Sequence, residues 1–311
     1  MKHLSILFLI FLVITISGCI GQDVIVVSTK DGVIITDFSF EHSPVYAEDN
    51  VGLGLEVQNV GDNIAQITKI QLYGVDFTSG SSSTEREWRI LGTGSQEVNI
   101  NDLPSKGELY QPDPDINLEA AKDYYEWRLQ APLVAAKTDY DFHARVEYSY
   151  TTTYTGIIRV INDDYLQTLN EEERQKLFSA GGMISSETTN GPISVTPFAS
   201  RHFIVTPGET GEREIKFKVE NVGKGYTYAD DQKYSIKLVD IRPKLGVGGI
   251  IASCNGGEPI IKLSSGKSHI FECDFVLPTD VKNKMDKTFQ LEFGYYYYVD
   301  DSASITVKPA Y

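Results

Sequence analysis

Apolar and polar side chains alternate with a period of two in two distant parts of the chain. One part covers residues 51–58 and the other covers residues 215–220. This period is typical of strands that bury one face and expose the other, so both parts are expected to be half-buried β-strands. The apolar positions are Val51, Leu53, Leu55 and Val57 in the first part and Ile215, Phe217 and Val219 in the second.

Both parts lead into the same triplet, Asn-Val-Gly, at residues 59–61 and 221–223. Asn bonds nearby backbone groups and Gly tolerates positive φ, so each triplet predicts a turn. The offset between similar segments falls from about 162 at the turns to about 146 near the C-terminal strands. We therefore expect two copies of one β unit, the first with an insertion at about 79–123. The further matching segments are 127–132 with 273–278, and 144–161 with 290–307.

The segment between the two copies is polar and predicts helical structure. Asn170 and Glu173 have the spacing of a capping box, and Asp163 or Asp164 is placed to cap an earlier turn. We expect one helix or two short helices here, followed by a flexible linker at 185–191.

The N-terminus has the organisation of an export signal. Lys2 gives it a positive start, and residues 4–16 form an apolar run that is short for a membrane span. The run leads into Ile16-Ser17-Gly18-Cys19, which resembles the prokaryotic lipobox. The resemblance implies cleavage before Cys19 and attachment of lipid to its thiol. The alternative is an uncleaved signal anchor with an unmodified cysteine, and in both cases the remaining chain is expected to be exported and tethered.

The net charge narrows the possible partners, and the chain length bears on the number of domains. The chain has 311 residues and a net charge of -15. No basic stripe is available to replace the counterions of phosphates, so nucleic acid is not an expected partner. The same charge disfavours peripheral adhesion to anionic lipid. The length itself favours two domains.

Two cysteines remain beyond the signal region, Cys254 and Cys273. An even pair in an exported domain predicts a disulfide. A reduced, buried pair is the alternative. A zinc site is disfavoured, because no CxxC motif or pair of histidines offers the other ligands.

Tyrosine is abundant, with 18 residues, and four of them stand together at 295–298. Strand alternation sends Tyr295 and Tyr297 to one face and Tyr296 and Tyr298 to the other, so one pair is expected in the core. We take Tyr296 and Tyr298 as the candidate aromatic binding surface, because exposed tyrosines stack on sugars or anchor protein interfaces. The alternative is cross-strand packing that adds only stability.

No catalytic constellation stands out in the sequence. Neither an HExxH helix nor a GxSxG elbow is present, and the five histidines are scattered. We therefore expect no enzymatic activity, no catalytic residues, no cofactor and no resident metal. Calcium at acidic loops such as 113–117 stays open, since carboxylates alternate there but the glycine and terminal glutamate of an EF-hand are missing.

Short strands separated by turns predict an all-β fold of two tandem antiparallel sandwiches joined by a short helical linker. An NxG strand, a Pro-terminated strand and a final aromatic strand occur twice in this order. This order resembles immunoglobulin-like domains of the CARDB and NEW3 type, found in prokaryotic surface and secreted proteins. The resemblance implies an adhesive or spacer module. The expected ranges are a signal peptide at 1–18, a first sandwich at 19–161, the helical segment and linker at 162–191, and a second sandwich at 192–311.

Together these features predict an archaeal or bacterial lipoprotein held at the membrane outside the cytoplasm. It is expected to act as a non-enzymatic binding or structural module of the adhesion type. One alternative is a carbohydrate- or envelope-polymer-binding lipoprotein, and another is an accessory subunit of a secretion or transport complex. The expected partners are the membrane, through lipid on Cys19, and a protein or glycan at the cell surface.

Overall fold

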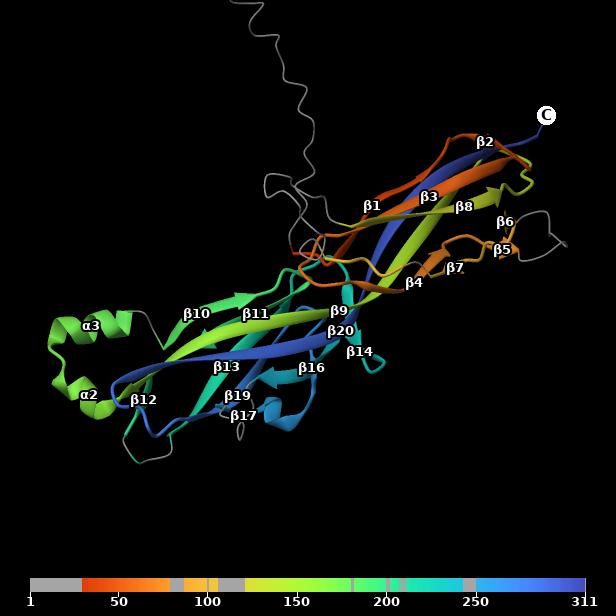
Figure 1. Ribbon diagram of the computed structural model, residues 1–311. Helices are drawn as coiled ribbons and strands as arrows, with labels where there is room; N and C mark the ends of the chain where they lie inside the picture. The colour runs from red at the N-terminus through yellow and green to blue at the C-terminus, as the bar shows by residue number, and fades with distance from the viewer. Residues whose placement is uncertain are drawn as a thin grey trace, which may run out of the picture.

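The computed structural model describes residues 30–78, 87–99, 101–105, 121–179, 182–199, 202–206, 208, 211–242 and 250–310. The predicted signal peptide, Cys19 and most of the predicted insertion at 79–123 lie outside them. The described chain is built mainly from β-strands, with two short α-helices (Figure 1). The expected all-β, largely antiparallel sandwich fold is confirmed.

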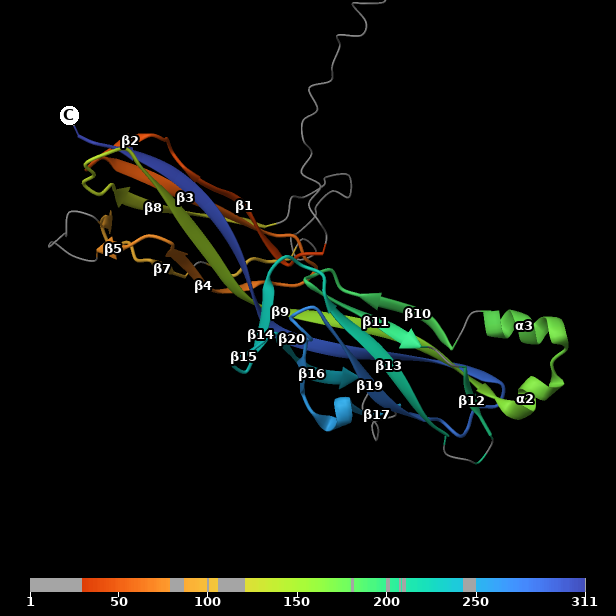
Figure 2. The same ribbon diagram turned by 180° about the vertical axis from the view of Figure 1, so that it is seen from behind.

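Two very long strands form the centre of the molecule. β9 (Thr138–Asn162) and β20 (Lys284–Lys308) each contain 25 residues, which corresponds to about 80 Å of extended chain. They pair antiparallel over nearly their whole length, from Lys284 opposite Ile161 to Val307 opposite Thr138. Strands in globular proteins usually have about 3–10 residues. This long pair therefore runs through the whole molecule, as both views show (Figures 1 and 2).

The long pair belongs to a back sheet of 11 described strands. β4 and β10 add to successive parts of β9, while β14 and β16 add to successive parts of β20. The other bounds in this sheet are β2 (Val45–Tyr46), β4 (Gln66–Tyr73), β7 (Glu97–Val98), β10 (Met183–Thr188), β12 (Phe203–Val205), β14 (Tyr226–Ala229), β15 (Gln232–Lys233), β16 (Ser235–Arg242) and β18 (Ile260–Lys262).

Two shorter front sheets cover one face of the back sheet, each forming a lobe with the part of the back sheet behind it. Alternate residues of β9, from Phe142 to Val160, are buried. Phe142 packs on Phe40 in the first lobe, and Tyr154 packs on Phe217 in the second, so the same face of β9 serves both lobes. The first front sheet contains β1 (Val33–Phe40), β3 (Asn50–Asn59), β8 (Lys122–Gln130), β6 (Trp88–Ile90) and β5 (Phe77–Thr78). The second contains β11 (Ile193–Ala199), β13 (Gly211–Asn221), β19 (Ser268–Leu277) and β17 (Ile251–Cys254).

The lobes therefore share their terminal strands. Residues of β9 up to Ser149 pair with β4 in the first lobe, and residues from Tyr154 onward pair with β10 in the second. β20 crosses in the opposite direction, from β16 in the second lobe to β2 at the far end of the first. The ranges 19–161 and 192–311 thus do not correspond to two separate bodies in space, because each contributes a strand to both lobes.

Four tyrosines fill the waist, where the two front sheets meet. Tyr148, Tyr150, Tyr295 and Tyr297 are at most 4% exposed and contact one another in series. This confirms that one pair of the 295–298 run lies in the core. The hydroxyls of Tyr148, Tyr150 and Tyr297 accept hydrogen bonds from the backbone N–H groups of Val33, Asn63 and Gly225, at 3.1, 3.0 and 2.7 Å.

Both Asn-Val-Gly turns close over these tyrosines with the same hydrogen bonds. Asn59 Oδ1 accepts from the N–H of Gly61 at 3.0 Å, and Asn59 Nδ2 donates to the carbonyls of Asn63 and Leu103, both at 2.9 Å. The second copy repeats the set: Asn221 accepts from Gly223 at 3.2 Å and donates to Gly225 and Gly266 at 2.9 and 3.3 Å. The repeated Asn-Val-Gly triplet is therefore a repeated turn, as the sequence predicts.

The glycine of each turn is needed for close approach rather than for positive φ, which corrects the sequence-based reason. Neither Gly61 nor Gly223 has positive φ. A Cβ added at Gly61 would lie 2.0 Å from the Tyr150 hydroxyl oxygen, and one at Gly223 would lie 2.6 Å from that of Tyr297. Tyr150 of β9 and Tyr297 of β20 therefore occupy equivalent positions in the two copies. The sequence offset between these two strands is thus 147 instead of the expected 146. The difference matters because a one-residue slip would turn the buried face of a strand outward.

The helical segment connects the two copies in sequence but lies at the far end of the second lobe (Figure 1). It contains α2 (Asp163–Thr168) and α3 (Glu171–Ser179). The capping box is confirmed, with reciprocal bonds of 2.9 and 3.1 Å between Asn170 and Glu173. The N-cap of α2 is Asn162, not Asp163 or Asp164, because β9 extends to Asn162.

Part of the predicted linker at 185–191 is a strand. β10 pairs with β9 as far as Thr188 opposite Tyr154. This edge of β9 would otherwise expose unpaired backbone groups, since β4 reaches only Ser149.

Replacing Asn59 with Ala is expected to lower the free energy of unfolding by about 2–3 kcal/mol. The change removes the amide that donates to the carbonyls of Asn63 and Leu103 and accepts from the N–H of Gly61. Asn221→Ala should have a similar effect, since the second turn has the same bonds. Urea denaturation followed by circular dichroism measures both. The matched control is Gln58→Ala, which changes a half-buried side chain and should cost less than about 0.5 kcal/mol. Near-neutral effects of both asparagine variants would refute the role given to the turns.

Alkaline pH is expected to destabilise the waist. Burial raises the pKa of Tyr150 to about 12, whereas tyrosine in the unfolded chain ionises near about 10. Below pH 10 both states keep the proton; between about pH 10 and 12 only the folded state keeps it, so stability is lost as the pH rises. Urea midpoints should therefore fall over this range, and less steeply in Tyr150→Phe. Equal slopes in the two proteins would contradict this assignment.

Candidate functional site

The outer face of the back sheet, opposite the front sheets, is hollowed at the waist. A groove of about 570 Å³ lies here, within the range of about 300–1,000 Å³ that small-ligand sites occupy. Its floor contains Ser149, Thr151 and Thr153 of β9 and Gly294 of β20. These positions alternate with the buried tyrosines, so their side chains and the tyrosine rings point to opposite faces of the same two strands. Tyr150 and Tyr295 also border the groove, between these floor residues.

Both copies contribute to the walls of this groove. Asn63 is tied to the floor, because its Nδ2 donates to the carbonyl of Thr151 at 2.6 Å. On the opposite side Val239 stands close to Gly294, where an added Cβ would lie 3.1 Å from Val239 Cγ1. The walls consist of Asn63, Ile64 and Gln66 from the first copy and Asp230, Lys237 and Val239 from the second, with Glu292 and Tyr296 on β20.

Tyr296, one of the two tyrosines predicted to bind, lines the groove and is 41% exposed. Its ring stacks on that of Tyr228, with centroids 5.0 Å apart and planes at 15°. The Tyr228 hydroxyl donates to Glu147 Oε2 at 3.1 Å, and burial together with this negative charge raises the pKa of Tyr228. One face of Tyr296 is thus held against an ordered neighbour, while the side chain still borders the groove.

Tyr298, the other predicted binding residue, lies on the same outer face but does not line the groove. Its ring covers the guanidinium of Arg145 at 4.2 Å, and Tyr226 packs beside it with centroids 5.3 Å apart. Arg145 is itself fixed by two hydrogen bonds to Asp300, at 2.8 and 2.9 Å. The two tyrosines therefore differ: Tyr298 is half-buried among packing partners, and Tyr296 has open space beside it.

The aromatic residues of this face break the internal symmetry of the two copies. Tyr228 pairs with Tyr296 across β14 and β20, and the equivalent pair across β4 and β9 is Gln66 with Ser149. By the same offsets, Ile64 and Thr151 correspond to Tyr226 and Tyr298. The first copy pairs β4 with β9 at Gln66 and Ser149 without aromatic side chains, so this strand pairing does not require them.

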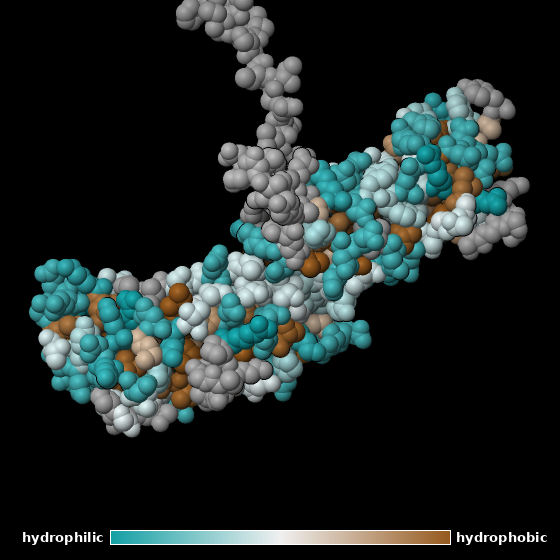
Figure 3. Space-filling view, in the orientation of Figure 1, coloured by the Kyte–Doolittle hydropathy of each residue, from teal (hydrophilic) through white to brown (hydrophobic). Residues whose placement is uncertain are grey.

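Exposed apolar side chains also gather around this face. Seven large hydrophobic residues are exposed in the described part of the chain, and Ile64, Tyr226, Val239 and Tyr296 are four of them. In the view of Figure 3 hydrophilic residues cover much of the visible face, and hydrophobic residues lie in small groups. Clustered exposed apolar side chains are typical of binding sites.

Charged side chains at the groove have partners. Lys237 Nζ lies 3.0 Å from Asp230 Oδ2, and Arg242 lies 3.7 Å from Glu292. Asp230 and Asp231 both have positive φ in the turn between β14 and β15. Within the described ranges no three His, Cys, Asp or Glu residues are grouped to hold a metal ion. The acidic loop at 113–117 lies outside those ranges.

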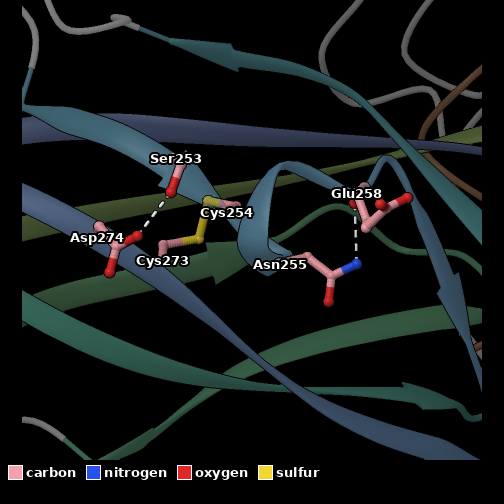
Figure 4. Close-up of a disulfide and its surroundings, with 6 residues drawn as sticks. All are labelled: Ser253, Cys254, Asn255, Glu258, Cys273 and Asp274. Atoms are coloured by element: carbon pink, nitrogen blue, oxygen red, sulfur yellow. Dashed lines mark hydrogen bonds between the residues drawn. A yellow bond between two sulfur atoms is a disulfide. The ribbon is translucent and has the colours of Figure 1, made fainter.

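The predicted disulfide between Cys254 and Cys273 is present. It joins neighbouring strands, β17 and β19, beside the 3-10 helix η2 (Asn255–Gly257) (Figure 4). Ser253 Oγ donates to Asp274 across the same strand pair at 2.6 Å. Both cysteines are buried, at 3% and 0% exposure. The bond is thus part of the second lobe's core and lies away from the groove lining.

The predicted lipidation site, Cys19, lies outside the described residues. Among the residues described, no helix combines the length and apolar character that crossing a bilayer requires.

The sequence marks Tyr296 as a candidate binding residue, but it does not mark the other residues that line the groove. Ser149, Thr151 and Gln66 are ordinary outward residues of alternating strands, and nothing local marks them. Tyr226 and Tyr228 alternate as strand residues do, yet their position beside Tyr296 depends on the pairing of β14 with β20. Only the long-range register brings these residues together.

Comparison with known proteins gives no family for this chain. No family model matches it, and no curated protein matches it. One solved structure with a weak likeness is that of Escherichia coli alpha-2-macroglobulin activated by porcine elastase, with 9% identity and a TM-score of 0.13. That match covers 90% of this chain and 33% of the other, so this chain spans about a third of that protein. A likeness this weak supports no argument about function.

Loss of the disulfide is expected to lower the free energy of unfolding by about 3 kcal/mol, because the bond closes a loop between residues 19 positions apart. Urea denaturation of the wild type and of the double variant Cys254→Ser, Cys273→Ser measures this. A reducing agent should shift the wild type toward the double variant and leave the variant unchanged. Equal midpoints for the oxidised wild type and the variant would contradict a stabilising bond.

Proposed function

We propose that the protein is a lipid-anchored cell-surface binding module without catalytic activity. Its tether is Cys19, and its binding surface is the groove on the outer face of the back sheet. The lipobox-like residues 16–19 support the anchor, and the open groove with exposed Tyr296 supports the binding role.

The observation that carries the proposal is the position of the groove relative to the start of the described chain. Val33 bonds to the Tyr148 hydroxyl on the inner face of the long pair, at the waist. Ser149 and Thr151 line the groove on the opposite face. If the tether joins the folded chain on this inner face, the groove lies on the opposite face, away from the tether.

The reach of the tether fits this orientation. Between Cys19 and Lys30 an extended chain spans at most about 40 Å. The waist would therefore stay near the membrane surface, and the groove would face outward toward large molecules of the envelope or the surroundings.

The shared strands suit a module that must keep its shape. Each lobe is completed by a strand from the other copy, so one lobe cannot turn freely against the other without breaking β9–β20 pairs. This agrees with the spacer or adhesion role that the CARDB and NEW3 resemblance implies.

The anchor is tested by Cys19→Ser in cells fed a clickable fatty acid. We expect loss of lipid labelling and release of the protein from the membrane fraction. The matched control, Ser17→Ala, keeps a small residue before the cysteine and should label like the wild type. Surface-applied protease should degrade the wild-type protein in intact cells. Undiminished labelling of Cys19→Ser, or full protection from protease, would refute the proposed anchoring and location.

A further inference from the structure

We propose that the groove binds a neutral saccharide, with the ring of Tyr296 as its stacking surface and the hydroxyl row of β9 as its hydrogen-bonding side. This inference rests on the proposed role as a surface binding module and gives the chemical class of its ligand. It uses one aromatic residue and the polar floor at the waist.

The stacking surface is preorganised. Tyr228 holds one face of the Tyr296 ring, and Glu147 in turn holds the Tyr228 hydroxyl at 3.1 Å. A tyrosine ring offers flat apolar area at small cost in side-chain entropy. The C–H face of a pyranose ring is flat and apolar in the same way, so it complements the side of Tyr296 that borders the groove.

The floor offers hydrogen bonds that the protein does not use itself. Within the described residues the hydroxyls of Thr151 and Thr153 have no hydrogen-bond partner. Ser149 Oγ donates to Gln66 Oε1 at 3.1 Å, which leaves the Gln66 amide nitrogen to donate to a ligand. Groups that both donate and accept match sugar hydroxyls, which also do both. From Ser149 to Thr153 the floor is about 13 Å long, enough for a short oligosaccharide.

The charges favour an uncharged ligand. The only cation in the described lining, Lys237, lies 3.0 Å from Asp230, which lines the same groove. Glu292 adds a further negative charge to the lining, although Arg242 stands 3.7 Å from it. The whole chain carries a net charge of -15. A uronate, phosphate or sulfate on the sugar would thus meet repulsion without an available positive partner.

The backbone disfavours an extended peptide as the occupant. A peptide that joins a sheet needs an open strand edge. At the groove β9 and β20 pair with each other, β16 covers the other edge of β20, and the Thr151 carbonyl already accepts from Asn63. What the groove presents is a ring and side-chain hydroxyls, which is the chemistry of sugar recognition.

The internal repeat supports a ligand rather than packing as the reason for these aromatics. Ser149 and Gln66 occupy the places equivalent to Tyr296 and Tyr228, and their strands pair in the same way. One half of the face around the waist is therefore aromatic and the other half hydroxylic. A groove between the two halves can contact the apolar C–H face of a sugar ring with its aromatic side and the sugar hydroxyls with its hydroxyl-bearing side. Two copies with the same side chains would not provide both kinds of contact.

The test uses the full chain purified in detergent, screened on an array of neutral gluco-, manno- and galacto-oligosaccharides beside polygalacturonate and heparin. We expect binding to at least one neutral glycan and none to the two polyanions. Isothermal titration with the best neutral hexasaccharide should show affinity about tenfold lower in Tyr296→Ala. Tyr296→Phe keeps the ring and should bind within about twofold of the wild type.

The matched control is Tyr124→Ala in β8. The Tyr124 side chain is 56% exposed and lies outside the groove lining. It should leave affinity unchanged, and thermal melts should show every variant folded. Binding of no neutral glycan, or equal losses in Tyr296→Ala and Tyr124→Ala, would overturn the proposal. If the wild type bound no glycan but bound a protein ligand, and Tyr296→Ala lost that binding, the saccharide proposal would be overturned. The proposed role as a surface binding module would then be retained. Failure of the anchor test with Cys19→Ser would instead refute the proposed location at the membrane and would not bear on saccharide binding.

Discussion

The antiparallel pairing of β9 with β20 is the constraint on which the rest of the structure depends. Because the two strands are 25 residues long and run through both lobes, each front sheet packs on a surface made by both copies. The core is accordingly one cluster that contains Phe142 of the first lobe and Phe289 of the second. Neither lobe has a complete back sheet of its own.

The waist explains why the pairing can continue without a break. Side chains on the inner face must change partners from the first front sheet to the second, and tyrosines are long enough to fill this gap. Their hydroxyls satisfy backbone N–H groups of loops that neither front sheet pairs, such as Asn63 and Gly225. The same strands then expose Ser149, Thr151 and Tyr296 on the outer face, so one alternation builds both the core and the groove.

Local features of the sequence predicted local structure well. Period-two alternation gave the strands, the Asn-Val-Gly triplets gave the turns, and Asn170 with Glu173 gave the capping box. The crossing of strands between lobes was not predictable in this way, because strand order depends on partners about 150 residues apart. For the site, alternation separated Tyr296 from Tyr297, but the groove required the register that sets Gly294 opposite Thr151.

Cooperative unfolding tests the shared-strand account most directly. Both tryptophans, Trp88 and Trp127, belong to the first lobe, so their fluorescence reports that lobe, while hydrogen exchange in β13 and β19 reports the second. If the lobes depend on the same strand pair, both signals must change at the same urea concentration. Loss of tryptophan burial while β13 and β19 remain fully protected would contradict the account.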